Sequence, residues 1–321
     1  MMRNFLKEIW SGVFILFIVS LFIATESFAG VYRFSGGPSG GTYQYYASGI
    51  STLAKKSGIN VLASSSRGSV ENIRLTHSGK ANFSVAYSGD IFQGRNGTLK
   101  QDTRKYDNIL ALAYLYGAPA QLIVKADSNI KSTCDLEGRR IGVGTPGSGA
   151  AASCETYFTA MGLWDKIERN FLGYREAADA FKNNQLDGFW VLAGFPNASV
   201  LEAALQTDIN LINTYKDGES VGLFEKYPCF SKVIVPANVY KGVVADVVTF
   251  QDSTIWIANK MVPEEVVYNL MKTVFAKEGL AYMISIHKSA KEMTIAGGVK
   301  GIVTPLHPGA EKFWKENGVV K

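Results

Sequence analysis

Two glycine-rich segments are the parts of this chain most able to bind a small molecule, residues 35–43 (SGGPSGGTY) and residues 142–150 (GVGTPGSGA). Each segment follows a short apolar run and opens a stretch with helical periodicity. A strand that ends in small residues and leads into a helix leaves backbone N–H groups without partners, and the positive end of the helix dipole lies behind them. The sequence therefore predicts two anion-binding turns, on two lobes that meet over one small anionic ligand.

A catalytic interpretation of the first segment is the main alternative, because residues 37–41 match the nucleophile-elbow pattern G-x-S-x-G around Ser39. Pro38 is poorly suited to the strained turn that carries such a nucleophile. A serine hydrolase also needs a histidine base, and the chain contains only His77, His287 and His307. An exported α/β serine hydrolase that uses Ser39 is therefore kept as the alternative to a binding protein.

Other catalytic and cofactor motifs do not fit the sequence. Gly41 is followed by Thr42 and Tyr43, whereas a phosphate-binding loop needs Lys followed by Ser or Thr. The glycine spacing does not match a dinucleotide fingerprint, and the Cys and His residues lack metal-ligand spacing. We therefore expect no enzyme activity, no catalytic residue, no metal and no cofactor.

Residues 1–29 have the pattern of a secretory signal peptide. Arg3 and Lys7 give it a basic start, an uncharged and mostly apolar stretch covers residues 9–25, and residues 27–29 (SFA) place small side chains at a cleavage site. The apolar stretch is slightly shorter than the roughly 20 residues that span a bilayer, and an uncleaved membrane anchor is the alternative. We expect a protein that is exported to the periplasm.

Charge and cysteine content narrow the class of protein further. The net charge is +5, and it stays at +5 without residues 1–29 because these contain two basic and two acidic residues. The basic residues are scattered, so they favour acidic solutes and predict no nucleic-acid surface. Cys154 falls on an apolar helix and is expected to be buried. Cys134 and Cys229 could form a disulfide in an oxidising compartment or stay free.

Short strands alternate with helices after residue 30, which predicts an α/β architecture with a largely parallel sheet. We expect strands at 31–34, 60–64, 81–87, 109–116, 121–125, 141–143 and 188–191. We expect helices at 44–56, 70–77 with Ser69 as its cap, 149–161, 175–182, from 197, 263–276 and 310–316. The expected parts are a leader at 1–29, lobe one at 30–118 and 248–321, and lobe two at 119–247, with two strands joining the lobes as a hinge.

Five motifs in the same order resemble the TAXI group of TRAP-transporter solute-binding proteins, which includes the periplasmic immunogenic proteins. The resemblance covers essentially all of residues 31–321. The motifs are residues 40–43 (GGTY), 68–72 (GSVEN), 135–141 (DLEGRRI) with 146–149 (PGSG), 187–190 (DGFW) with 194–196 (GFP), and 304–318 (TPLHPGAEKFWKENG). Each motif is weak alone, and their shared order makes the resemblance specific.

This resemblance implies a two-lobe periplasmic-binding-protein fold, type II-like, with two hinge crossings. Such a protein is not an enzyme: it closes on a solute and delivers it to a TRAP-type membrane permease. The solute is often a dicarboxylate or an amino acid, such as glutamate or 2-oxoglutarate. The expected partners are therefore a small anionic solute and a permease, with no nucleic acid, and the protein is expected to be a monomer. A surface interaction protein with a vestigial cleft is the remaining alternative.

The ligand-binding residues follow from the residue types and the resemblance together. Arg67 stands where the family commonly has a small residue, and its guanidinium could bind a carboxylate or lie on the surface. Thr42 and Ser69 could instead cap helices. The chain departs from the family at residues 87–89, where Gln-Ser-Asp is usual, and at Ala150, where Thr is usual. The expected contacts are Gly41, Thr42, Tyr43, Arg67, Ser69, Tyr87, Ser88, Gln121, Thr145, Gly147, Ser148, Gly149, Ala150, Gly194 and Phe195.

Overall fold

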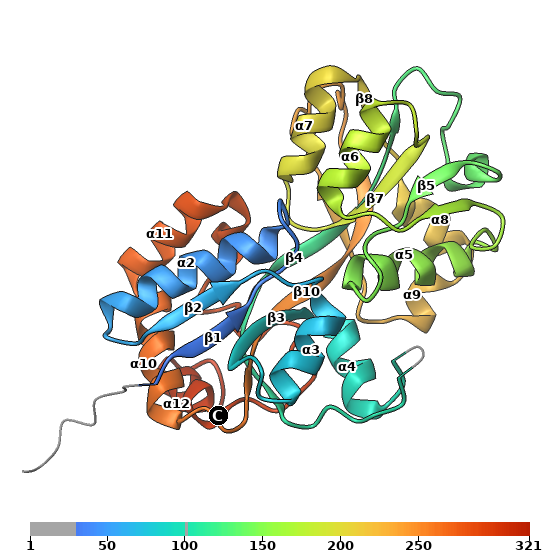
Figure 1. The fold of residues 1–321 in the computed structure, drawn as a ribbon. Helices are drawn as coiled ribbons and strands as arrows, with labels where there is room; N and C mark the ends of the chain where they lie inside the picture. The colour runs from blue at the N-terminus through green and yellow to red at the C-terminus, as the bar shows by residue number, and fades with distance from the viewer. Residues whose placement is uncertain (1–29, 100–101) are drawn as a thin grey trace, which may run out of the picture. The chain divides into compact units, whose positions relative to one another are not determined.

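A mixed β-sheet runs through the part of the chain that the structure describes (Figure 1). The structure is a computed structural model that describes residues 30–99 and 102–321, so the predicted leader at 1–29 lies outside the described residues. The strands are β1 (Tyr32–Ser35), β2 (Val61–Ser64), β3 (Phe83–Tyr87), β4 (Ile109–Lys125), β5 (Arg140–Gly142), β6 (Glu168–Asn170), β7 (Gly188–Leu192), β8 (Ile209–Leu211), β9 (Ser231–Val235) and β10 (Val247–Asn259). The helices are α2 (Thr42–Lys56), α3 (Ser69–His77), α4 (Ser88–Asn96), α5 (Gly149–Ala160), α6 (Tyr174–Lys182), α7 (Ala198–Gln206), α8 (Thr214–Ser220), α9 (Leu223–Lys226), α10 (Glu264–Phe275), α11 (Lys277–Ile286) and α12 (Pro308–Glu316), with 3-10 turns η1 (Thr133–Leu136) and η2 (Lys288–Glu292).

Two groups of parallel strands flank a centre of two long antiparallel strands. The order across the sheet is β2-β1-β3-β10-β4-β7-β5-β6, with β8 paired to β4 and β9 paired to β10. β1 pairs in parallel with β2 and β3, and β5 pairs in parallel with β6 and β7. β10 is antiparallel to β3 and β4, and β4 is antiparallel to β7. The α/β prediction is confirmed, but the sheet is mixed rather than largely parallel because β4 and β10 cross it in opposite directions.

The long strand β4 corrects the prediction of two separate strands at 109–116 and 121–125. Residues 117–119 stay extended because β10 pairs with them, Gln251 lying opposite Pro119. From Ala120 onward the partner is β7 instead. Pro119 has no N–H to donate, and it lies where β4 exchanges one partner for the other, a position in which a strand tolerates proline. A glycine and a proline therefore did not end this strand.

The strand order divides the described elements into two groups. We call β1–β3 with α2–α4 and α10–α12 the first half, and β5–β9 with α5–α9 the second half. Figure 1 shows β4 and β10 passing from one group to the other. The predicted lobe boundaries fall inside β4 and at the start of β10 and stay a prediction, since residues 31–321 cluster as one compact unit.

Each half has its own aromatic core. In the first half, the ring centres of Phe34, Phe83 and Trp256 lie 6.1 to 6.3 Å apart. In the second half, the Tyr157 ring stacks on the Trp190 ring with centres 5.2 Å apart. All five side chains are buried, and burial of a large apolar side chain stabilises a fold by about 1.5–3 kcal/mol. These cores fix the strand ends from which the site is built.

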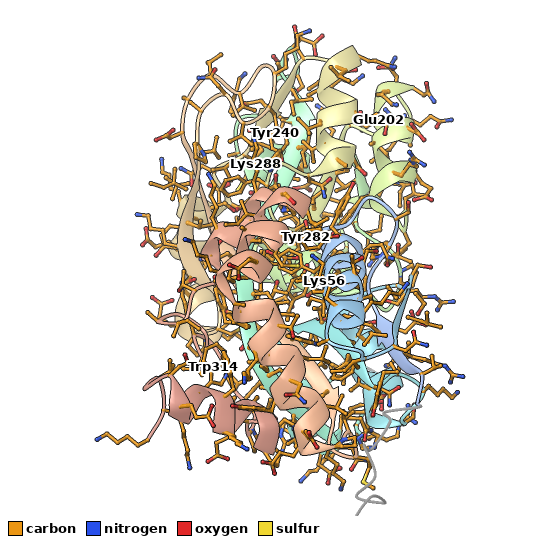
Figure 2. All side chains as sticks on the ribbon, turned by 90° about the vertical axis from the view of Figure 1, so that its left-hand side faces the viewer. Lys56, Glu202, Tyr240, Tyr282, Lys288 and Trp314 are labelled. Atoms are coloured by element: carbon orange, nitrogen blue, oxygen red, sulfur yellow. The ribbon has the colours of Figure 1, made fainter. Side chains whose placement is uncertain are left out.

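The C-terminal helices pack on the first half. The Trp314 indole nitrogen donates a hydrogen bond to the Leu112 carbonyl at 2.7 Å, and its ring centre lies 5.0 Å from that of Phe275. Figure 2 labels Trp314 on α12, and it labels Lys56 and Tyr282 where α2 and α11 pack together. The Lys56 amine lies 5.4 Å from the centre of the Tyr282 ring. The segment after residue 259 is therefore an integral part of the first half.

Some local predictions are wrong. Ser69 is the first residue of α3 rather than its cap; Gly68 is the cap, and its φ of 114° and ψ of −152° suit only glycine. The Ser69 hydroxyl instead accepts a hydrogen bond from the Tyr87 N–H at 2.9 Å. The sequence did not predict helix α4, which covers Ser88–Asn96.

The cysteines carry free thiols in the structure. Cys134 is exposed, Cys229 is half-buried and Cys154 is buried, so a Cys134–Cys229 disulfide is not formed and the prediction for Cys154 is confirmed. Among the described residues, no helix is both long and apolar enough to cross a membrane.

Candidate functional site

The carboxyl ends of strands from both halves meet at one small cavity, which we call the tyrosine cavity. This is the edge at which open α/β sheets bind ligands. Four helices of at least nine residues begin at it: α2, α3, α5 and α6. The lining residues are Pro38, Gly41, Thr42, Tyr43, Arg67, Gly68, Ser69, Tyr87, Tyr116, Thr145, Ser148, Gly149, Ala150, Gly173, Tyr174, Leu192 and Ala193.

The start of α5 has the geometry that the second glycine segment predicts. Ser148 is the cap of the helix, and its hydroxyl accepts a hydrogen bond from the Ala151 N–H at 3.0 Å. Gly149 and Ala150 are the first helical residues, and the first N–H groups of a helix have no partner within it. A methyl group on Gly149 would lie only 2.4 Å from Cδ2 of Tyr87. Only a glycine allows α5 to approach the first half this closely.

Four tyrosines surround the cavity. The ring centres of Tyr43 and Tyr87 lie 5.0 Å apart. The Tyr87 hydroxyl donates to the Leu192 carbonyl of the second half, and the Tyr174 hydroxyl donates to the same carbonyl at 2.8 Å. Within the described chain, the buried hydroxyls of Tyr43 and Tyr116 have no hydrogen-bond partner. Since buried polar atoms are normally paired, these two hydroxyls indicate a missing polar ligand.

Burial also sets the charge of these side chains. It raises the pKa of Tyr43, Tyr87, Tyr116 and Tyr174 above that of a free phenol. All four therefore stay neutral at physiological pH, and the unpaired hydroxyls of Tyr43 and Tyr116 keep a proton to donate to a ligand. Together with the helix N-termini they form a donor-rich surface, which suits an anion.

Arg67 is the cation of this cavity. It lies on the loop before α3 and is exposed. Its backbone N–H donates to the Glu71 carboxylate at 2.6 Å. Its guanidinium makes no hydrogen bond or ion pair with any residue that the structure describes. Arg67 can therefore bind a carboxylate in the cavity without giving up another partner.

The two halves touch around the cavity. The Thr42 hydroxyl donates to the Gly194 carbonyl at 3.5 Å, and the Asn197 amide donates to the Gly40 carbonyl at 3.3 Å. The cavity volume is about 20 Å³, which is space for about one water molecule. As it stands, the tyrosine cavity is therefore too small for an organic solute.

Ten of the fifteen predicted contact residues line the tyrosine cavity, and five do not. Gln121 is buried beside it, where its amide donates to the Ala193 carbonyl at 2.9 Å and its carbonyl accepts from Tyr240. Ser88 donates to the Gly301 carbonyl, and Gly194 accepts from Thr42. Gly147 lines a neighbouring groove, and half-buried Phe195 lies outside both linings.

Sequence reasoning missed two of the four tyrosines. Tyr116 lies in an apolar strand without a local signal, and Tyr174 is the residue before the predicted start of its helix. Tyr174 follows Gly173 and precedes two charged residues, so it did not stand out either. The helix start at Gly173 lacks the glycine-rich pattern of the two predicted turns and was not recognised as part of the site.

The described hydrogen bonds do not support the hydrolase alternative, because none of them joins a histidine to Ser39. Ser39 is exposed at its turn. The histidines are engaged elsewhere: His77 with Asn108, His287 with Ser289 and His307 with Val262 and Gly309. Among the residues described, no group of three or more His, Cys, Asp or Glu side chains could hold a metal ion.

Known proteins share the fold of this chain. The mixed α/β fold, with its curled sheet, is that of periplasmic binding proteins. The chain belongs to the NMT1-like family, whose profile matches residues 34–318.

Three solved structures share the fold. MatC from Rhodopseudomonas palustris, solved with bound malate, has a TM-score of 0.54 at 14% identity, over 91% of this chain and 99% of that chain. A protein from Bordetella bronchiseptica RB50 has a TM-score of 0.52 at 15% identity, over 92% and 90%. A periplasmic transporter structure has a TM-score of 0.54 at 14% identity, over 92% and 94%.

Proposed function

We propose that this protein is a solute-binding protein of a membrane import system, which closes on a small anionic organic solute in the tyrosine cavity. The observation that carries the proposal is the convergence of four helix N-termini from both halves on one cavity. Helix N-termini offer N–H donors and a positive dipole end to an anion. Arg67 and the unpartnered tyrosine hydroxyls add donors of the same kind. MatC, which shares the fold, holds the dicarboxylate malate.

The finer proposal is that the protein belongs to the TAXI group and delivers its solute to a TRAP-type permease. The five sequence motifs support this assignment. The solute is a dicarboxylate or an amino acid, of which glutamate and 2-oxoglutarate are examples. The protein acts in the periplasm as a monomer after removal of residues 1–29.

Solute entry requires motion of one lobe relative to the other. The lobes are residues 30–118 with 248–321 and residues 119–247, as the sequence predicts, and β4 and β10 are the two crossings. Closed and open arrangements exchange, and the solute shifts the balance toward the closed one. The contacts of Thr42 with Gly194 and of Tyr87 with Leu192 form only on closure.

Native mass spectrometry of the purified protein, followed by a thermal-shift screen of dicarboxylates and amino acids, tests this function. We expect a co-purified organic acid, or a rise in melting temperature with at least one acid. Arg67→Ala should then weaken binding of that acid by about tenfold to a hundredfold, the usual worth of a charge-assisted hydrogen bond. Arg139→Ala, at an exposed arginine away from the cavity, is the matched control.

Two outcomes would contradict the function. If no acid co-purifies and no acid raises the melting temperature, the binding proposal is wrong, and a surface protein with a vestigial cleft is favoured. Ester hydrolysis that is lost in Ser39→Ala would favour the hydrolase.

A further inference from the structure

A second and larger space lies next to the tyrosine cavity, and we call it the acidic groove. It has a volume of about 1010 Å³. Residues of α3, α4 and α5, together with the segment 227–230 before β9, form its walls. Arg67, Tyr87 and Gly149 line both spaces. A solute held at the start of α5 can therefore extend into this groove.

Two buried carboxyl groups line the acidic groove where it meets α5. Asp90 lies in the first turn of α4 and is 7% exposed, and Asp252 lies in β10 and is 4% exposed. Asp252 accepts hydrogen bonds from the N–H groups of Gly89 at 3.2 Å and Ser253 at 2.7 Å. Neither carboxyl forms an ion pair with any residue in the described ranges.

The Asp90 carboxylate faces the groove with one oxygen unused. Its Oδ2 atom is buried and has no hydrogen-bond partner among the residues described. This oxygen would lie 2.7 Å from a methyl group on Gly149, so it sits at the start of α5. The Tyr43 hydroxyl, on the tyrosine-cavity side, is also buried and unpartnered. The unpaired oxygen of Asp90 therefore indicates a missing polar partner at this place, because buried polar atoms are normally paired.

Charged side chains of both signs line the acidic groove: Asp90, Asp252 and Glu155 are acidic, and Arg67, Arg74 and Arg169 are basic. Burial raises the pKa of Asp90 to about 6, and a hydrogen bond with Ser69 opposes this rise. Burial also raises the pKa of Asp252, to which the charge of Asp90 contributes. The Cys229 thiol has its pKa raised to about 12 and stays neutral. At neutral pH Asp90 is therefore largely ionised, and it forms no ion pair with a described residue, which is unfavourable for a buried carboxylate unless a cation is added.

We propose that Asp90 and Asp252 form a subsite for a protonated amine, so that the solute carries an ammonium group as well as its carboxylate. The carboxylate lies at the N–H groups that begin α5, and the ammonium lies at the unused oxygen of Asp90. The inference rests on the proposed function, and within it selects amino acids over dicarboxylates that lack an amine. Arg67, which lines both spaces, supplies the complementary charge for a carboxylate.

Calorimetry with matched pairs of acids tests this subsite. The pairs are L-glutamate with 2-oxoglutarate, L-aspartate with oxaloacetate, and L-alanine with pyruvate, which differ in the amine. At pH 7.5 we expect the wild-type protein to bind the amine-bearing member of at least one pair about tenfold to a hundredfold more tightly, the range for hydrogen bonds between charged groups. Asp90→Asn and Asp252→Asn should remove this preference. Asp127→Asn, at an exposed carboxylate outside both spaces, should keep it.

A second measurement on the wild-type protein does not depend on the variants folding. Because an ammonium ion favours the ionised form of Asp90, binding of the amine-bearing probe at pH 6 should release protons to the buffer. Binding of the oxo acid should take protons up. Calorimetry in two buffers of different ionisation enthalpy measures both directions.

The outcomes separate the two proposals. Equal or tighter binding of the oxo acid in every pair, or proton uptake with the amine-bearing probe, would overturn the acidic subsite and leave the anion site standing. No binding of any of the six probes would also overturn the subsite. If native mass spectrometry and the wider screen of acids found nothing either, the proposed function would fall with it.

Discussion

The tyrosine cavity and the acidic groove share the start of α5 but differ in charge. The cavity presents helix N-termini, neutral phenols and Arg67, and it has a volume of about 20 Å³. The groove presents two buried carboxyls and encloses about 1010 Å³. A single helix end can thus offer a site to an anion while neighbouring residues of the groove offer one to a cation. A substitution at the shared boundary should affect both regions, and a substitution within one region should leave the other intact.

The largest effect is expected from Gly149→Ala, which disturbs the boundary of both regions. The new methyl group would lie 2.4 Å from Tyr87 and 2.7 Å from Asp90, so the halves could not close as they do here. Overpacked contacts cost about 1–3 kcal/mol, and solute affinity should fall on the order of a hundredfold. Titration of the solute identified by the screen measures this. Ala160→Ser, at the far end of α5, is the control; an affinity unchanged by Gly149→Ala would break the closure account.

The acidic groove should make ligand-free stability depend on pH. Burial raises the pKa of Asp90 to about 6, so its protonated form is favoured by folding. This contribution is fully present below pH 4 and is lost as the pH rises through 6. As the pH rises from 4 to 7, the free energy of unfolding of the wild-type protein should therefore fall by about 2 kcal/mol relative to that of Asp90→Asn.

Urea unfolding at four pH values measures this difference between the two proteins. Asp127→Asn serves as the control, since its carboxylate is exposed. If the stability of Asp90→Asn followed that of wild type at every pH, Asp90 would not be the buried acid described here.

A smaller effect is expected from Tyr43→Phe, which alters only the tyrosine cavity. The lost hydroxyl has no partner in the described chain, so the ligand-free protein should keep its melting temperature or gain a little. Affinity for the solute should fall by about tenfold, because a hydrogen bond to a charged group is lost. Tyr46→Phe removes a hydroxyl that is hydrogen-bonded to Ser289 at 3.0 Å. This variant should therefore lose stability instead. If Tyr43→Phe lost stability but kept its affinity for the solute, the hydroxyl would stabilise the fold and would not bind the solute.

The smallest effect is expected from Cys229→Ser in the acidic groove. Burial raises the pKa of this thiol to about 12, so it contributes no charge at neutral pH. Affinity for amine-bearing probes should change less than about twofold, since a neutral hydroxyl replaces a neutral thiol. Thiol labelling should modify exposed Cys134 first. A tenfold loss of affinity in Cys229→Ser would show that the thiol belongs to the subsite.

The sequence predicted the elements that end in glycine-rich turns better than those that do not. The starts of α2 and α5 follow from small residues after an apolar run, a local signal. Asp90 and Asp252 carry no such signal, since they lie 162 positions apart and meet only because β10 returns beside β3. Asp252 also lies among polar neighbours at residues 249–254 (TFQDST), so it did not stand out in the sequence.

The boundaries of β4 and the cap of α3 failed for a related reason. Pairing with β10 kept residues 117–119 extended against their local preference. The residue type of Ser69 suggested that it caps α3, but the structure has Gly68 at the cap and Ser69 as the first helical residue. In both cases tertiary contacts decided between two locally acceptable conformations.

The most direct measurement of the central claim is a crystal structure with the solute that native mass spectrometry or the thermal-shift screen identifies. The account predicts the carboxylate of the solute within hydrogen-bond distance of the Gly149 and Ala150 N–H groups, and an ammonium group within that distance of Asp90. A solute bound outside both spaces, or one whose anionic group lies against Asp90, would contradict it.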